Sequence, residues 1–91
     1  MVPKSLLSVF TTYILQSEKD NRFYIGSTGD VGKRVVKHNK GYSRYTKGKG
    51  PFKLAYKEDY ETLSGAKKRE CYLKSLKSRI AIEKLIRGAF V

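Results

Sequence analysis

Apolar and polar positions alternate in three short stretches of the chain, which predicts three strands. Residues 6–16 and 22–27 are rich in β-branched and aromatic side chains, and residues 52–60 alternate between apolar and polar positions. A polar segment of turn-forming residues separates the first two stretches, so they are expected to form an antiparallel hairpin.

Helical periodicity begins after the hairpin. Asp30 can cap a helix that runs to about Lys40, with Val31 and Val35 facing inward. A second helix is predicted from Thr62 or Ser64 to about Lys77. A third is capped by Ser78, and its apolar positions are Ile82, Leu85, Ile86 and Ala89.

The predicted order of elements is β-β-α-β-α-α. This order indicates an α/β fold of the α+β type, with a small, mainly antiparallel three-stranded sheet flanked by helices. A length of 91 residues indicates one domain, 1–91, whose core spans about 9–87.

Two tyrosines, Tyr13 and Tyr24, lie in the strands of the predicted hairpin. If the loop proper is residues 17–20, they lie directly opposite each other on one face of the sheet, and a change of one residue in loop length would break that pairing. Gly26 is expected to end the second strand and to let a backbone approach closely. The simpler interpretation of both tyrosines is packing, because a phenol is a poor base at neutral pH.

Glu70 interrupts the apolar stripe of the second predicted helix, which is formed by Leu63, Ala66, Leu73 and Leu76. A carboxylate that faces a core is costly unless it is paired or binds a metal. It could form a buried ion pair, for example with Arg34, or bend out to solvent. The functional alternative is a divalent cation, because Mg²⁺ is often held by one or two carboxylates and water.

Composition then adds a strong charge signal. Twenty Lys and Arg against eight Asp and Glu give a formal net charge of +12, which makes a polyanion, and nucleic acid in particular, the expected partner. No apolar run approaches the ~20 residues that span a bilayer, and the N-terminal segment does not resemble a signal peptide. The single Cys71 forms no internal disulfide, so a reducing, cytoplasmic setting is expected.

The basic residues gather around the first predicted helix and the segment after it. Arg34 and His38 share a helix face, where an arginine can hold a phosphate and a histidine can move a proton, although a solvated basic face is the simpler interpretation. The segment 39–53 interleaves cations with aromatic rings, which suits a nucleic-acid strand. The expected nucleic-acid contacts are Lys33, Lys37, Lys40, Arg44, Lys47 and Lys49.

Four short motifs, in this order and spacing, resemble the GIY-YIG nuclease domain. They are "TTYIL" with Tyr13, "YIG" with Tyr24, "KRVVKH", and the helical "KKRE". The resemblance covers roughly residues 9–87 and is closest to the small stand-alone bacterial members. It implies phosphodiester hydrolysis with one divalent metal, Mg²⁺ or Mn²⁺.

The resemblance also implies roles for single residues. Tyr13 matches the tyrosine that helps activate the attacking water, and Tyr24 matches the tyrosine that supports the same site. Arg34 would stabilise charge on the scissile phosphate, and His38 would hydrogen-bond the phosphate or the water. Glu70 matches the metal-binding glutamate.

The chain departs from the family pattern in two places. Its first motif reads "TTY" in place of Gly-Ile-Tyr, and no asparagine follows the glutamate-bearing helix. Three functions are therefore weighed: a metal-dependent endonuclease that acts on DNA with weak sequence specificity, a nucleic-acid-binding module that cleaves poorly or not at all, and a basic RNA- or ribosome-associated protein. The presence of Tyr13, Arg34, His38 and Glu70 together favours the endonuclease.

Overall fold

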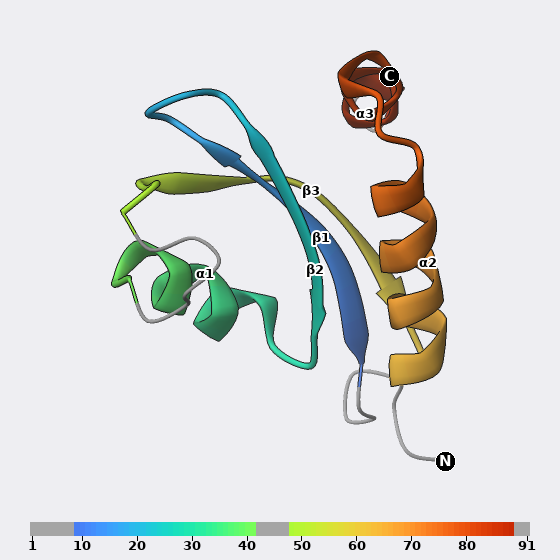
Figure 1. The fold of residues 1–91 in the computed structure, drawn as a ribbon. Coiled ribbons are helices and arrows are strands. Elements are labelled where there is room, and N and C mark those ends of the chain that lie inside the picture. Colours follow the sequence, from blue (N-terminus) through green and yellow to red (C-terminus); the bar gives the residue numbers. More distant parts are fainter. Residues whose placement is uncertain (1–8, 42–47, 89–91) are drawn as a thin grey trace.

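A central three-stranded sheet organises the residues described by this computed structural model, 9–41 and 48–88 (Figure 1). The strands are antiparallel in the order β2-β1-β3, so β1 is central and β2 and β3 are edges. The elements are β1 (Phe10–Ser17), β2 (Phe23–Thr28), α1 (Val31–Asn39), β3 (Phe52–Tyr60), α2 (Leu63–Ser75) and α3 (Arg79–Gly88). The predicted fold class and order are confirmed.

Helix α1 lies on one side of the sheet and α2 on the other, as Figure 1 shows. The strand period of two decides which side chains of β1 meet which helix. Tyr13 and Leu15 belong to the apolar cluster against which Val31 and Val35 of α1 pack. Ile14, between them in the sequence, belongs to a second cluster with Leu73 of α2 and Ile82 of α3.

The helices begin where the capping residues predict. The side chain of Asp30 accepts a hydrogen bond from the Lys33 amide at 3.0 Å, and that of Thr62 accepts one from the Gly65 amide at 3.0 Å. Ser78 caps α3 through the Ala81 amide at 3.2 Å. These bonds satisfy amides that have no partner within the helix. Ala89, expected in the core, lies outside the described residues.

The register of the hairpin differs from the prediction by two residues. Tyr13 pairs with Gly26, and Tyr24 pairs with Leu15. The turn is longer than residues 17–20 because the Ser17 hydroxyl accepts hydrogen bonds from two turn amides and Asn21 takes a positive φ of 62°. A shift of two residues preserves the alternation, so both tyrosines still lie on the α1 face of the sheet.

The strand boundaries also move slightly. The first predicted strand, 6–16, is observed from Phe10, and residues 6–8 lie outside the described part of the chain. Gly26 lies inside β2 and does not end it, so the expectation of a strand end at this glycine is wrong.

Candidate active site

A hydrogen bond between Tyr13 and His38 joins the sheet to α1. The Tyr13 hydroxyl lies 3.1 Å from Nε2 of His38, and both residues are buried, with 4% and 6% of their surface exposed. The strand alternation aims Tyr13 at α1, and His38 comes from the last turn of that helix. The structure therefore brings together a phenol and an imidazole that are 25 residues apart in the sequence.

Gly26 makes room for the Tyr13 ring. A Cβ atom at Gly26 would collide with the Tyr13 hydroxyl and would stand only 2.6 Å from its Cζ. Any other residue would therefore displace the ring. The glycine of "YIG" is explained by this contact with the Tyr13 ring, whereas the sequence suggested the close approach of a backbone.

The environment of His38 favours its neutral form. Burial is the main cause that lowers the pKa of His38, and the positive charge of Arg34, one helical turn earlier, lowers it further. A neutral imidazole can accept a proton at one ring nitrogen. The Tyr13 hydroxyl can therefore donate to Nε2 when that nitrogen is unprotonated.

Tyr24 packs on the same face of the sheet as Tyr13. Its ring meets that of Phe52 edge to face, with centroids 5.3 Å apart and planes at 87°. The ammonium of Lys49 lies 5.6 Å from the centre of the Tyr24 ring. Burial raises the pKa of Tyr24, so its phenol stays protonated at neutral pH. Tyr24 thus supports the cluster around Tyr13.

Glu70 lies on the other face of the sheet. Its carboxylate accepts a hydrogen bond from the Ser27 hydroxyl at 2.6 Å and pairs with the Lys74 ammonium at 2.7 Å. The ion pair that the sequence left open is therefore present, but its partner is Lys74 and not Arg34. Burial opposes ionisation of this carboxyl, but the hydrogen bonds from Lys74 and Ser27 outweigh it, and the pKa of Glu70 lies below its ordinary value. The predicted inward stripe holds at Ala66 and Leu73 but not at Leu63, which is 41% exposed.

The two groups of residues meet across strand β2. Tyr13 lies over Gly26 on the α1 face, and Glu70 contacts the next residue, Ser27, from the α2 face. Because β2 is an edge strand, no further strand of the described sheet separates the two faces there. Arg34 is half-buried on α1, next to His38. The structure therefore brings Tyr13, His38 and Arg34 together on the α1 side, whereas Glu70 lies on the α2 side of the edge strand β2.

A metal at this position would depend on Glu70. Among the described residues, no three carboxylate, imidazole or thiol side chains converge as ligands. Glu70 is ionised, and 18% of its side chain is exposed, so it can offer oxygen to a hard cation that keeps most of its water. The residues fit a one-carboxylate site, in which Lys74 competes with the cation.

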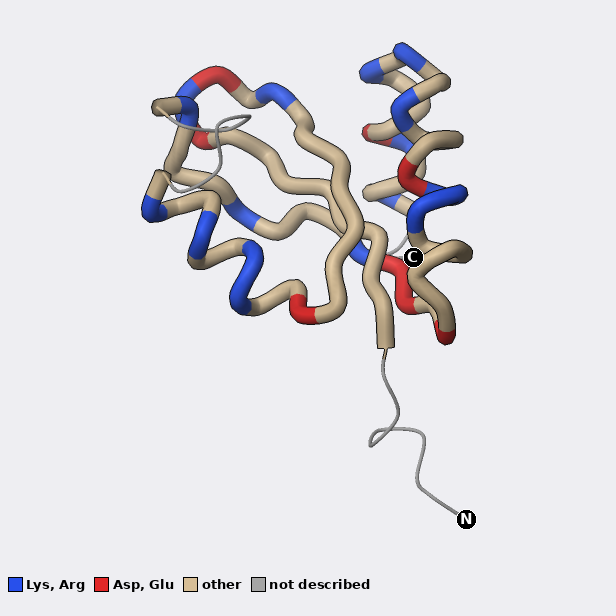
Figure 2. The backbone as a smooth tube through the Cα atoms, turned by 60° about the horizontal axis from the view of Figure 1, so that its bottom comes forward, with Lys and Arg blue, Asp and Glu red and all other residues tan. Residues whose placement is uncertain are grey.

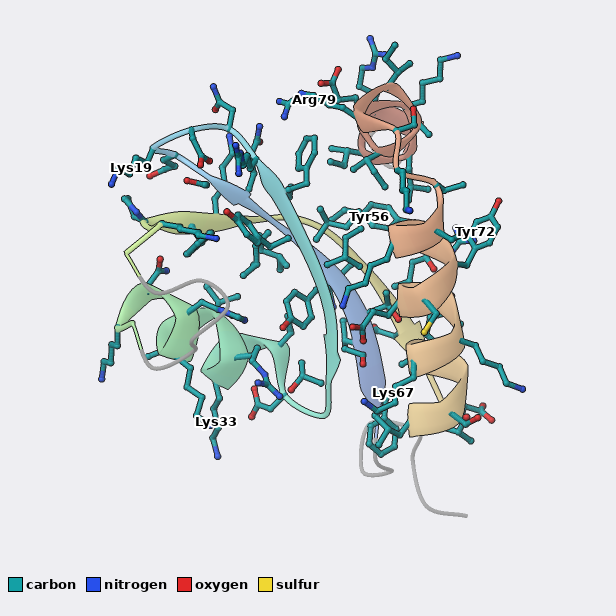
Figure 3. All side chains as sticks on the ribbon, viewed as in Figure 1. Lys19, Lys33, Tyr56, Lys67, Tyr72 and Arg79 are labelled. Carbon is teal, nitrogen blue, oxygen red and sulfur yellow. The ribbon has the colours of Figure 1, made fainter. Side chains whose placement is uncertain are left out.

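The predicted nucleic-acid contacts lie on the α1 side where they can be located. Figure 2 shows basic residues along α1 and again along α2 and α3, on opposite sides of the sheet. Lys33 points away from the sheet in Figure 3, and Lys37, Lys40 and Lys49 are also exposed. Arg44 and Lys47 lie outside the described residues.

Sequence reasoning missed Ser27 and Lys74, the two partners of Glu70. Lys74 follows Glu70 by four residues on a predicted helix, which is the favourable spacing for an ion pair, so this contact could have been found. Nothing in the sequence identified Ser27, because its contact with Glu70 depends on how α2 lies on β2.

The fold is that of a known class of domain. The GIY-YIG catalytic domain matches residues 9–84, and the chain therefore belongs to the GIY-YIG family. No helix among the described residues has the length and apolar character needed to cross a membrane.

Its relatives in this family include small bacterial proteins. The chain is 45% identical over 65 residues to a UPF0213 protein of Clostridium perfringens, covering 70% of this chain and 69% of that one. It is 37% identical over 71 residues to a UPF0213 protein of Staphylococcus saprophyticus, covering 77% and 87%. The solution NMR structure of a UPF0213 protein from Bacillus halodurans is similar, with a TM-score of 0.55, 34% identity, and coverage of 87% of this chain and 83% of that one.

Proposed function

We propose that this protein is a metal-dependent endonuclease that hydrolyses phosphodiester bonds in DNA. The observation that supports this most is the buried hydrogen bond between the Tyr13 hydroxyl and Nε2 of His38, at 3.1 Å. A purely structural tyrosine needs no titratable partner whose pKa is lowered toward the neutral form. A nuclease can use such a pair, because the attacking water must lose a proton.

The proton route follows from these two side chains. The Tyr13 oxygen lies at the α1 face and can receive a hydrogen bond from water when its own proton is shared with His38. Neutral His38 accepts that proton at Nε2, and the same contact holds the ring of Tyr13 in place. In this proposal, Tyr13 activates the water and His38 holds the proton that Tyr13 gives up.

Charge at the phosphate is handled by two other residues. Arg34 contributes a guanidinium beside His38, with a donor geometry that matches phosphate oxygens. Glu70 would hold one Mg²⁺ or Mn²⁺ through its ionised carboxylate, and the cation, when bound, supplies positive charge to the phosphate and the leaving oxygen. Substrate must then lie at the edge of β2, where both faces of the sheet can be reached.

Weak sequence preference and steep salt dependence form part of the proposal. The exposed cations Lys33, Lys37 and Lys40 are suited to phosphates, which carry affinity but no sequence information. Binding should therefore weaken strongly between low and physiological salt. Equal affinity at both salt concentrations would contradict this part.

A second candidate is a nucleic-acid-binding module without efficient cleavage. It is favoured by one observation: the carboxylate of Glu70 already has partners in Lys74 and Ser27. In that case Glu70 would serve to attach α2 to β2. Its replacement would lower the stability of the fold, and the wild type would show no cleavage for the variant to lose.

The test compares the wild type with Glu70→Gln on plasmid, single-stranded and branched DNA, with Mg²⁺, Mn²⁺ or a chelator. Glu18→Gln, at an exposed position of the hairpin turn, is the matched control. Metal-dependent cutting that is lost in Glu70→Gln and kept in Glu18→Gln would support the nuclease and the role of Glu70. Bound but uncut DNA in the wild type would favour the binding module.

A further inference from the structure

An open hollow lies between the start of β2 and the junction of α2 and α3. Its volume is about 300 Å³, near the lower limit for pockets that take small organic ligands. Its floor is apolar and is made by Phe23 and Ile25 of β2, Leu73 of α2 and Ile82 of α3. None of these residues belongs to the Tyr13 side of the sheet.

Four cationic side chains line the same hollow: Arg22, Lys74, Lys77 and Arg79. Arg79 is held in place by the Asn21 carbonyl at 2.7 Å and by a carboxylate of its own helix, and its guanidinium lies 4.6 Å from the centre of the Phe23 ring. Figure 3 shows Arg79 reaching from α3 toward the hairpin. Among the ion pairs of the described residues, none involves Lys77.

We propose that this hollow binds one unpaired nucleotide of a DNA strand next to the Glu70 site, an inference that rests on the proposed function. An apolar floor with a cationic rim is complementary to a nucleotide, whose base is flat and apolar on its faces and whose phosphates are anionic. The stacked pair of Arg79 and Phe23 offers a rigid edge for the base. Lys77 and Arg22 are placed for the flanking phosphates.

Lys74 connects the hollow to the metal ligand. It lines the hollow and at the same time pairs with Oε2 of Glu70 at 2.7 Å. A phosphate in the hollow competes with Glu70 for this ammonium, and a carboxylate released from Lys74 is a better ligand for a divalent cation. DNA and the cation therefore strengthen each other's binding by the same factor.

The test measures binding to a fluorescent oligothymidylate by anisotropy, in chelator so that nothing is cut. Arg22→Gln/Lys77→Gln is compared with Lys68→Gln/Lys84→Gln, which removes the same charge from exposed positions outside the hollow. We expect the first pair to weaken binding about tenfold and the second less than about threefold. Equal losses in both pairs would overturn the proposal.

Methyl NMR locates the strand independently of affinity. Oligothymidylate should shift the methyl signals of Ile25, Leu73 and Ile82, and Mn²⁺ should bind more tightly in its presence. Shifts confined to Val31 and Val35, equal shifts with a blunt duplex, or equal shifts with an oligoglutamate peptide would overturn the assignment to an unpaired nucleotide.

The outcomes separate this proposal from the proposed function. A wild type that binds in the hollow but never cuts DNA would leave the hollow standing and refute the nuclease. If the wild type cuts DNA but the hollow variants bind like their controls, the nuclease would stand and the hollow would be refuted. A wild type that does not bind single-stranded DNA would overturn the hollow, and cleavage of the plasmid and branched DNA would still test the nuclease.

Discussion

Replacing Gly26 by alanine should damage the candidate active site without removing any polar group from it. The new Cβ would collide with the Tyr13 hydroxyl and stand 2.6 Å from Cζ and 3.1 Å from Cε2. The ring cannot simply swing away, because it is 4% exposed and its hydroxyl meets His38. Gly26→Ala should therefore displace Tyr13 and break this contact.

The expected cost comes from two opposing effects. Inserting a methyl group into a packed site costs about 1–3 kcal/mol, whereas exchanging glycine for alanine on an ordinary backbone gains about 0.4–1 kcal/mol through the unfolded chain. The net loss of stability is about 1–2 kcal/mol, or roughly 4–16 °C in Tm for a domain of this size. Thermal and urea unfolding measure both values.

Gly29→Ala is the matched control, since its Cβ would lie 3.7 Å from the nearest Phe10 carbon, an ordinary contact. A double-mutant cycle with Tyr13→Leu isolates the clash, because Gly26→Ala should cost less once the ring is gone. In Gly26→Ala the pKa of His38 should also move up toward its ordinary value as water enters. A Gly26→Ala variant as stable as Gly29→Ala, with the same cost in the leucine background, would refute the reasoning.

Three further predictions concern proton chemistry. Tyr13→Phe should lower the cleavage rate by about 10²-fold or more while DNA affinity changes less than about threefold, because only the hydroxyl that meets His38 is lost; equal losses in both would refute it. Burial raises the pKa of Glu58, but hydrogen bonds from Tyr56 and Arg69, among others, outweigh this effect and hold the pKa below its ordinary value. The free energy of unfolding, measured in urea, should therefore fall as the pH drops below the ordinary carboxyl pKa, and it should fall less in Glu58→Gln. Burial and Glu58 raise the pKa of Tyr56 to about 12, so its stabilising contribution should be complete below the ordinary phenol value and lost as pH approaches 12, which tyrosinate absorbance would show.

Local rules of the sequence account for most of the fold. The alternation over residues 52–60 predicted β3 with its observed bounds, Phe52–Tyr60, because a half-buried strand leaves a period of two in its side chains. Asp30 and Ser78 marked helix starts because their side chains satisfy nearby amides. These features depend on neighbours within a few residues, which a single sequence displays.

The geometry of one turn and the contacts between elements account for what the sequence left undetermined. The length of the hairpin turn depends on hydrogen bonds to the Ser17 hydroxyl and on the positive φ of Asn21, so the loop length assumed from composition was short by two residues. Residue spacing placed Glu70 on α2 with Lys74 four residues later, but its second partner, Ser27, depends on how α2 lies on β2. The family resemblance pointed to Tyr13 and His38, and only the structure brought them into contact.

The candidate site depends on which face of the sheet each residue of β2 occupies, and the register of the hairpin decides this. Gly26 and Ser27 are neighbours in β2, yet one receives the Tyr13 ring on the α1 face and the other holds Glu70 on the α2 face. A shift of two residues, such as the one between prediction and structure, keeps Gly26 on the α1 face and Ser27 on the α2 face, but it would place Tyr13 opposite Tyr24 instead of Gly26. A shift of one residue would turn Gly26 toward α2 and Ser27 toward Tyr13, so that the ring would meet a side chain and Glu70 would lose its hydroxyl partner. The turn that fixes this register therefore fixes the relation between the phenol and the carboxylate.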